Sequence, residues 1–189
     1  MPRLSLLAIA LAIVQPGPLL TLEFRVFRGT EDVTSQTRLK VHRAGERGQP
    51  VAQTASGTAP RITVPPGIYD AQAVQEQDAR AVNIRWAERL VVMPYPDEDG
   101  HHLEVINFTP GYGALQIREP AGRAPADSIA VYPEKQRGQP SANAAGQAPF
   151  TLFVLPAGRY DIQVKRGSRS WWHPGIEVPP DRTRLWFIP

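Results

Sequence analysis

Val64-Pro65-Pro66-Gly67-Ile68-Tyr69-Asp70 is the stretch that decides the fold, because it recurs about 90 residues later as Leu155-Pro156-Ala157-Gly158-Arg159-Tyr160-Asp161. Each copy leads from a proline–glycine turn into a strand, where apolar and polar side chains alternate, as in Tyr160-Asp161-Ile162-Gln163-Val164-Lys165. A period of two buries one sheet face and leaves the other in solvent. Because proline presets φ and glycine tolerates a positive φ, we expect the Pro-x-Gly sequence to form a tight turn before each strand.

Two further matches occur in the same order in both halves of the chain. Arg47-Gly48-Gln49-Pro50 recurs as Arg137-Gly138-Gln139-Pro140 before the turn. After the turn, Trp86 and Trp172 each precede two apolar residues at the same spacings. Several matches in one order indicate an internal duplication.

Each copy closes with another strand-like run, 103–108 in the first and 184–188 in the second. A repeat of this length is too long for a solenoid unit and suits a small domain. We therefore predict two tandem domains, residues 21–109 and 110–189, which meet at the turn-forming Thr109-Pro110-Gly111.

The remaining apolar runs are short and have the period of strands, and the 20 prolines and 15 glycines between them disfavour helices. The expected fold is all-β: two tandem antiparallel β-sandwich domains of about seven strands each. The predicted strands, besides the closing runs, cover residues 22–27, 38–42, 61–64 and 69–73, then 114–118, 128–132, 150–154 and 160–165.

Residues 1–20 have the pattern of an export signal. Arg3 precedes an apolar run over residues 4–14, and Pro16-Gly17-Pro18 follows it. Such a run is too short for a comfortable membrane span of about 20 residues, so we expect a signal peptide or an uncleaved anchor. The protein is then exported, periplasmic or extracellular, and touches a membrane only through this segment if it is uncleaved.

Composition excludes several classes of function. The chain has no cysteine, which rules out a disulfide framework, a thiolate nucleophile and a cysteine metal site. A formal charge of +3 is too small for a nucleic-acid footprint, so no nucleic-acid partner is expected. We expect no cofactor, and we assign no catalytic residue, because no nucleophile elbow or phosphate-cradling loop is present.

The order of these elements resembles the transthyretin-like (prealbumin-like) sandwich superfamily and is similar to carboxypeptidase regulatory-like repeats of exported bacterial proteins. The resemblance rests on the Pro-x-Gly-x-Tyr-Asp turn and strand, the tryptophan strand and the closing strand. It implies accessory, adhesive or surface modules. Hydroxyisourate hydrolases of this fold end in Tyr-Arg-Gly-Ser, whereas this chain has Trp186-Phe187-Ile188-Pro189, so their activity is not expected.

Trp171, His173 and Arg169 are the candidate contact residues. Trp172 matches Trp86 by spacing and is expected in the core, so Trp171 is expected to point the other way. An outward tryptophan stacks on a sugar ring or anchors a protein partner. The alternative is that Trp171 packs against the neighbouring repeat.

Asp97, Asp99, His101 and His102 are weak candidates for a metal site, since carboxylates suit Ca²⁺ and imidazoles suit transition metals. The Asp99-Gly100 pair favours a solvated hairpin turn instead.

The function that fits best is a non-catalytic exported binding or structural module that recognises an envelope or surface protein. A polysaccharide-binding module is the first alternative, and it predicts that Trp171 is exposed and lies near other aromatic residues such as Tyr112 or Tyr132. A hydrolase is the second alternative, and it requires histidines and carboxylates to gather in a cleft where the two repeats meet.

Overall fold

The computed structural model describes residues 19–57, 60–78, 80–94, 101–120, 122–147 and 149–189. They form fifteen strands, β1 to β15, and one 3-10 helix, η1 (Thr34–Gln36), without any α-helix among them. The predicted all-β class is therefore confirmed. The predicted export segment lies outside the described residues except for Leu19 and Leu20, and Leu20 already begins β1. None of the described residues forms a helix long and apolar enough to cross a membrane.

The first eight strands build two sheets, which we call unit 1. One sheet has the order β2-β1-β5, with β8 on the free side of β1, and the other has the order β4-β3-β6-β7. The strands are β1 (Leu20–Arg28), β2 (Glu31–Asp32), β3 (Thr37–Arg43), β4 (Ala52–Gln53), β5 (Arg61–Val64), β6 (Gly67–Gln77), β7 (Arg80–Val92) and β8 (His101–Asn107).

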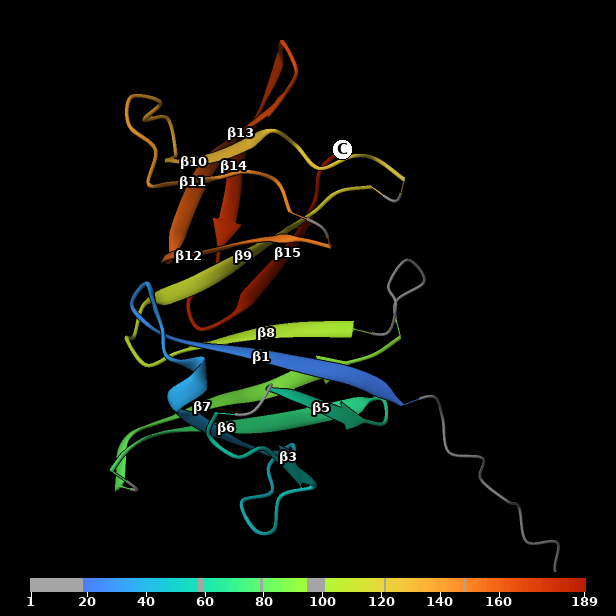
Figure 1. Ribbon diagram of the computed structural model, residues 1–189, viewed down its shortest axis with the longest axis vertical. Coiled ribbons are helices and arrows are strands. Elements are labelled where there is room, and N and C mark those ends of the chain that lie inside the picture. Colours follow the sequence, from blue (N-terminus) through green and yellow to red (C-terminus); the bar gives the residue numbers. More distant parts are fainter. Residues whose placement is uncertain (1–18, 58–59, 79, 95–100, 121, 148) are drawn as a thin grey trace, which may run out of the picture.

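The remaining strands build two more sheets, which we call unit 2. Their orders are β12-β9-β15 and β11-β10-β13-β14, so they repeat the pairing of unit 1 strand for strand apart from β2. Figure 1 shows unit 2 above unit 1, with β8 and β9 at the level where they meet. The strands are β9 (Tyr112–Arg118), β10 (Ser128–Pro133), β11 (Ala142–Ala144), β12 (Thr151–Pro156), β13 (Gly158–Arg166), β14 (Arg169–Val178) and β15 (Thr183–Phe187).

The expectation of wholly antiparallel sheets is wrong for the first and last strand of each unit. β8 runs parallel to β1, and β15 runs parallel to β9, whereas all other pairs are antiparallel. A parallel pair requires a crossover connection. Here the crossover passes through the opposite sheet. The chain forms the strands of that sheet before its last strand pairs with the first strand of the unit.

Each unit has its own core between its two sheets, as expected for alternating strands. The largest fully buried side chains come from both sheets of each unit: Leu22, Phe24, Leu39 and Val41 in unit 1, and Leu115, Ile117, Ile129 and Ile162 in unit 2.

The recurring tyrosine holds the proline–glycine turn closed. The Tyr69 hydroxyl donates to the Pro65 carbonyl at 2.7 Å, and unit 2 repeats this bond with Tyr160. Gly67 does not use the positive φ that glycine tolerates. A Cβ at Gly67 would instead lie 3.2 Å from the Tyr69 ring, so the position is glycine because the ring folds back over the backbone.

The recurring aspartate anchors the loops around it. In unit 2, the 2% exposed Asp161 side chain accepts hydrogen bonds from the Gly175 and Lys135 backbone N–H groups, at 3.1 and 3.2 Å, and from Arg137. Gly175 lies in a β-bulge of β14 opposite Asp161. The Arg137 guanidinium lies 4.3 Å from the centre of the Trp172 ring. Arginine, aspartate and tryptophan of the repeated motifs thus form one cluster.

Unit 1 repeats this cluster. Asp70 accepts from the Arg89 and Gly45 N–H groups, at 2.8 and 2.9 Å, and pairs with Arg47. Arg47 stacks 3.8 Å from the centre of the Trp86 ring. The two tryptophans therefore occupy equivalent positions, but the expectation that they lie in the core is wrong. Both are only partly buried, because they pack beneath an arginine on the outer face of the sheet.

Candidate functional site

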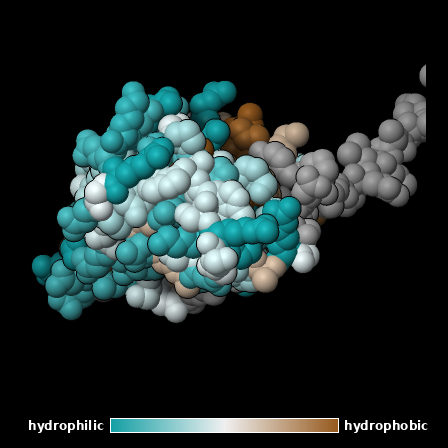
Figure 2. All heavy atoms as spheres, turned by 90° about the horizontal axis from the view of Figure 1, so that it is seen from above, coloured by the Kyte–Doolittle hydropathy of each residue, from teal (hydrophilic) through white to brown (hydrophobic). Residues whose placement is uncertain are grey.

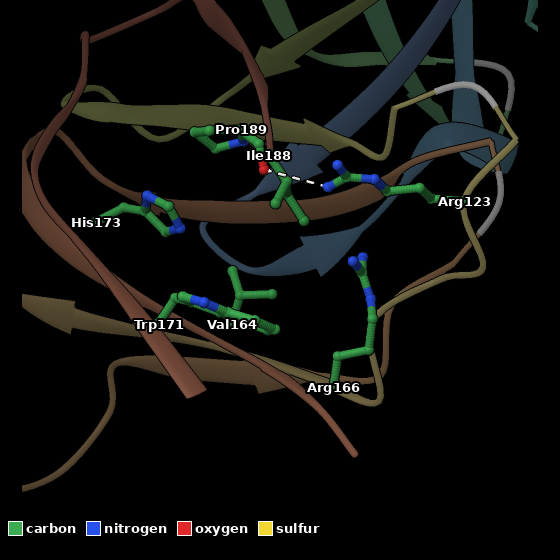
Figure 3. A pocket seen from close by; sticks show the side chains of 7 residues that line it. All are labelled: Arg123, Val164, Arg166, Trp171, His173, Ile188 and Pro189. Carbon is green, nitrogen blue, oxygen red and sulfur yellow. Dashed lines mark hydrogen bonds between the residues drawn. The ribbon is translucent and has the colours of Figure 1, made fainter. Parts of the chain in front are cut away.

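An apolar pocket of about 200 Å³ opens between β14 and β15 of unit 2. Figure 3 shows Trp171 and His173 on one side, Arg123 and Arg166 on the other, and Ile188 between them. The seven residues that line it are Arg123, Val164, Arg166, Trp171, His173, Ile188 and Pro189.

The β13–β14 hairpin positions the tryptophan and the histidine. Its two-residue turn pairs Arg166 with Arg169, which places Trp171 opposite Val164. Since residues directly opposite in a sheet share a face, and Val164 is buried, Trp171 lies on the inner face. Trp171 was expected on the outer face of the sheet, and this expectation is wrong. The side chain is nevertheless 42% exposed, because the edge strands β14 and β15 leave the sandwich open here.

His173 closes the inner end of the pocket. Its ring meets the Trp186 ring edge-on, with centroids 5.0 Å apart and an interplanar angle of 64°. Burial lowers the pKa of the His173 imidazole, so it is neutral at neutral pH. A neutral imidazole packed on an indole adds to the apolar surface of the pocket.

Two arginines provide the positive charge at the opposite rim. Arg166 forms an ion pair with Glu119, which is only 11% exposed in its side chain. Arg123 donates to the Pro189 main-chain oxygen at 3.4 Å and pairs with no Asp or Glu side chain among the described residues. Arg123 is exposed, so its charge remains available to a carboxylate brought into the pocket.

The structure thus brings together two of the three predicted contact residues. Trp171 and His173 line the pocket, whereas Arg169 is exposed at the start of β14 and does not. Sequence reasoning missed Arg123, which lies in the β9–β10 connection and has no motif around it. The inner position of Trp171 had a signal, because the two-residue turn fixes the hairpin register.

The predicted metal site remains a prediction. Asp97 and Asp99 lie outside the described residues, as does the side chain of His101. The His102 Nε2 atom lies 2.7 Å from the Met93 carbonyl oxygen. Within the described part of the chain, no three His, Cys, Asp or Glu side chains gather as metal ligands would.

The two units meet through polar contacts. The Val105 N–H of β8 donates to the Thr183 hydroxyl at 2.8 Å, and Arg85 of β7 pairs with Asp181 at 2.5 Å. Burial raises the pKa of the Glu104 carboxyl to about 7, although hydrogen bonds from Thr183 favour its charged form. A shallow depression at this junction contains Arg85, Glu88 and Asp181 but no histidine among its described lining residues.

Trp171 is exposed, as the sugar-binding alternative expects, but the two tyrosines named for that alternative do not line its pocket. Tyr132 packs against Trp172, with ring centroids 5.1 Å apart, on the outer face of the sheet. Trp171 lies on the inner face, and neither Tyr132 nor Tyr112 lines its pocket. Seen from above the molecule, the exposed surface of the described residues is largely hydrophilic (Figure 2).

No protein-family model matches the chain, and no curated protein matches it. Solved structures that resemble it include the Bacillus anthracis TIE protein (TM-score 0.31, 13% identity), a leucine-rich repeat protein from Bacteroides thetaiotaomicron (0.28, 10%) and the tip fimbrial protein Mfa3 from Porphyromonas gingivalis (0.34, 12%). Each match covers 90% of this chain, which spans 33%, 26% and 94% of those chains respectively. These scores describe a likeness between β-rich structures and carry no argument about function.

Proposed function

We propose that the protein is a non-catalytic binding module that uses the unit 2 pocket to hold a protein partner. The observation that carries this proposal is the 42% exposed Trp171 beside an apolar floor, with Arg123 and Arg166 across the opening. Tryptophan and arginine are the side chains that most often dominate the binding energy of protein interfaces. A tryptophan held on a rigid hairpin also loses little conformational freedom when it binds.

A protein partner suits the pocket better than a sugar does. Val164, Ile188 and Pro189 form an apolar surface beside Trp171. Sugars need hydrogen-bonding groups close around the aromatic ring, because unpaired hydroxyl groups are costly to bury, whereas the two arginines of this pocket lie across the opening from Trp171. An apolar side chain of a partner would fill the same space without that cost.

The domain family and the cell location that we infer agree with this function. We infer that residues 21–109 and 110–189 are two transthyretin-like domains, because the pairing of strands repeats between units 1 and 2. We also infer that residues 1–20 export the chain, so the partner is an envelope or surface protein. The sequence pattern of that segment supports this inference.

The proposal is tested by crosslinking in the native host, followed by affinity capture of the full chain and mass spectrometry. Trp171→Ala should abolish capture of the partner. The matched control is Ile84→Ala, since Ile84 is a 57% exposed apolar residue on β7 of unit 1. Equal capture by the wild type and Trp171→Ala would contradict the proposal, and co-purified polysaccharide lost with Trp171 would favour the sugar-binding alternative.

A further inference from the structure

The unit 1 surface that corresponds to the Trp171 pocket is covered by unit 2. The equivalence follows from strand register, because Trp86 lies opposite Gln72 as Trp172 lies opposite Gln163. Arg85 therefore takes the place of Trp171. In both units this position lies on the edge strand that borders the opening between the two sheets.

The segment that covers the unit 1 opening is the turn between β14 and β15, Pro179-Pro180-Asp181-Arg182, with the first residue of β15. The Asp181 carboxylate pairs with Arg85 at 2.5 Å. The Thr183 hydroxyl accepts the Val105 N–H at 2.8 Å, which satisfies an outward-facing donor of the edge strand β8. Unit 1 thus binds a turn that follows two prolines, through the carboxylate of Asp181 and the hydroxyl of Thr183.

The corresponding opening of unit 2 has no such turn over it among the described residues. By strand pairing, Phe187 of β15 corresponds to Val105, and its side chain is 46% exposed, whereas Val105 is buried. On the edge strand β14 of the same unit, Trp171 is 42% exposed, and Arg123, which contacts the Pro189 main-chain oxygen, pairs with no Asp or Glu side chain in the described part of the chain. The same side of the sandwich is therefore occupied in unit 1 and open in unit 2.

We propose that the unit 2 pocket binds a tight turn of another protein, one that carries an aspartate or glutamate next to proline. The carboxylate pairs with Arg123, as Asp181 pairs with Arg85, and the proline ring packs on Trp171 and Ile188. This inference rests on the proposed function, since it names the kind of partner that the pocket takes. The occupant is a turn because the β14–β15 turn covers the corresponding opening of unit 1.

The charge at the pocket supports a carboxylate rather than a neutral turn. Glu119 already neutralises Arg166, which leaves the exposed Arg123 as the other cation that lines the pocket. An exposed ion pair contributes about 0–1 kcal/mol, so burial against Trp171 must provide most of the affinity. An isolated turn should consequently bind weakly, with a dissociation constant on the order of 1 mM, and more weakly in high salt.

The test uses a probe copied from this chain, the backbone-cyclised hexapeptide Val-Pro-Pro-Asp-Arg-Thr of residues 178–183, titrated into the full-length protein. The four tryptophan indole N–H signals are followed by two-dimensional NMR and assigned with single Trp→Phe variants. We expect the Trp171 signal to shift saturably. Replacing the peptide's aspartate with asparagine should weaken binding about tenfold or more.

A charge swap provides the internal control. Arg123→Glu should remove binding of the aspartate peptide and restore binding when that aspartate is replaced by lysine. Arg80→Glu, at an exposed arginine of unit 1, should change neither. Equal shifts with the aspartate and asparagine peptides, or a shift at Trp86 alone, would overturn the carboxylate turn as ligand.

The outcomes separate this inference from the proposed function. If the peptide does not bind but Trp171-dependent capture of a protein persists, only the acidic turn is wrong. If both fail, the binding module itself is wrong. A Trp171 signal that moves with protein concentration alone would identify a second copy as the occupant and would overturn the external partner.

Discussion

Replacing Asp161 with asparagine should destabilise unit 2 by about 3 kcal/mol, because hydrogen bonds to a charged group contribute roughly 1.5–3 kcal/mol each. One carboxylate oxygen accepts the Gly175 N–H, and the other accepts the Lys135 N–H and Arg137. Asparagine keeps one acceptor oxygen, but its NH₂ group, itself a donor, faces the Lys135 N–H and the Arg137 guanidinium. The bond to Lys135 is lost, and the remaining bond loses its charge assistance.

The assay is urea unfolding followed by tryptophan fluorescence, combined with hydrogen exchange of the Lys135 and Gly175 amides, whose protection should fall in Asp161→Asn. The matched control is Asp127→Asn. Asp127 is exposed and accepts the Gly167 N–H, so this change should cost less than about 1 kcal/mol. Equal losses in the two variants would refute the reasoning that the buried carboxylate anchors the loops.

The same cluster makes a pH prediction. Burial alone would raise the pKa of the Asp161 carboxyl, but hydrogen bonds from Gly175, Lys135 and Arg137 outweigh it and hold the pKa below its ordinary value. A depressed carboxyl pKa stabilises the fold above the unfolded value of about 3.9, and this contribution is lost as the pH falls through the folded pKa. Acid unfolding of the wild type should therefore be steeper below about pH 4 than that of Asp161→Asn.

Three further outcomes follow from the fold. Tyr69→Phe should cost about 1 kcal/mol in unfolding experiments, since the hydroxyl bond to the turn carbonyl is lost while the ring still packs; an unchanged midpoint would contradict this. Thr183→Val should expose the Val105 amide to faster hydrogen exchange and leave the pocket of unit 2 intact, as judged by the Trp171 indole signal. The pKa of Glu104 is raised from 4.5 to about 7, so the folded chain binds more protons than the unfolded chain between these values. Stability should accordingly fall as pH rises through that window, and Glu104→Gln should flatten the profile.

Local sequence patterns were sufficient for the strands and for the duplication. The alternation in Tyr160-Asp161-Ile162-Gln163-Val164-Lys165 reflects one buried face, and the structure places Tyr160, Ile162 and Val164 in the core. The same alternation, with Ala71 and Ala73 as the apolar residues after Tyr69, predicted the strand that is β6 in the structure. Such patterns are local consequences of a two-residue period, so they can be read without knowledge of the partner strands.

The repeated motifs were recognised, but their roles were not. Arg137, Asp161 and Trp172 are separated in sequence and meet only when β14 bulges opposite Asp161. The bulge adds one residue to β14 and so shifts the pairing of the residues that follow it with β13. The spacing could therefore identify Trp172 as equivalent to Trp86, but it could not show that both lie under an arginine.

The sequence by itself determined an all-β chain with a repeated turn, strand and tryptophan motif, because these features depend on neighbouring residues. Tertiary structure alone decided that β15 lies parallel to β9 and that Arg123 lies across the pocket from Trp171. Each of these depends on how two sheets close over one core. Closure brings together residues that are distant in the chain, and within the described residues it leaves no turn over the unit 2 opening where unit 1 has one.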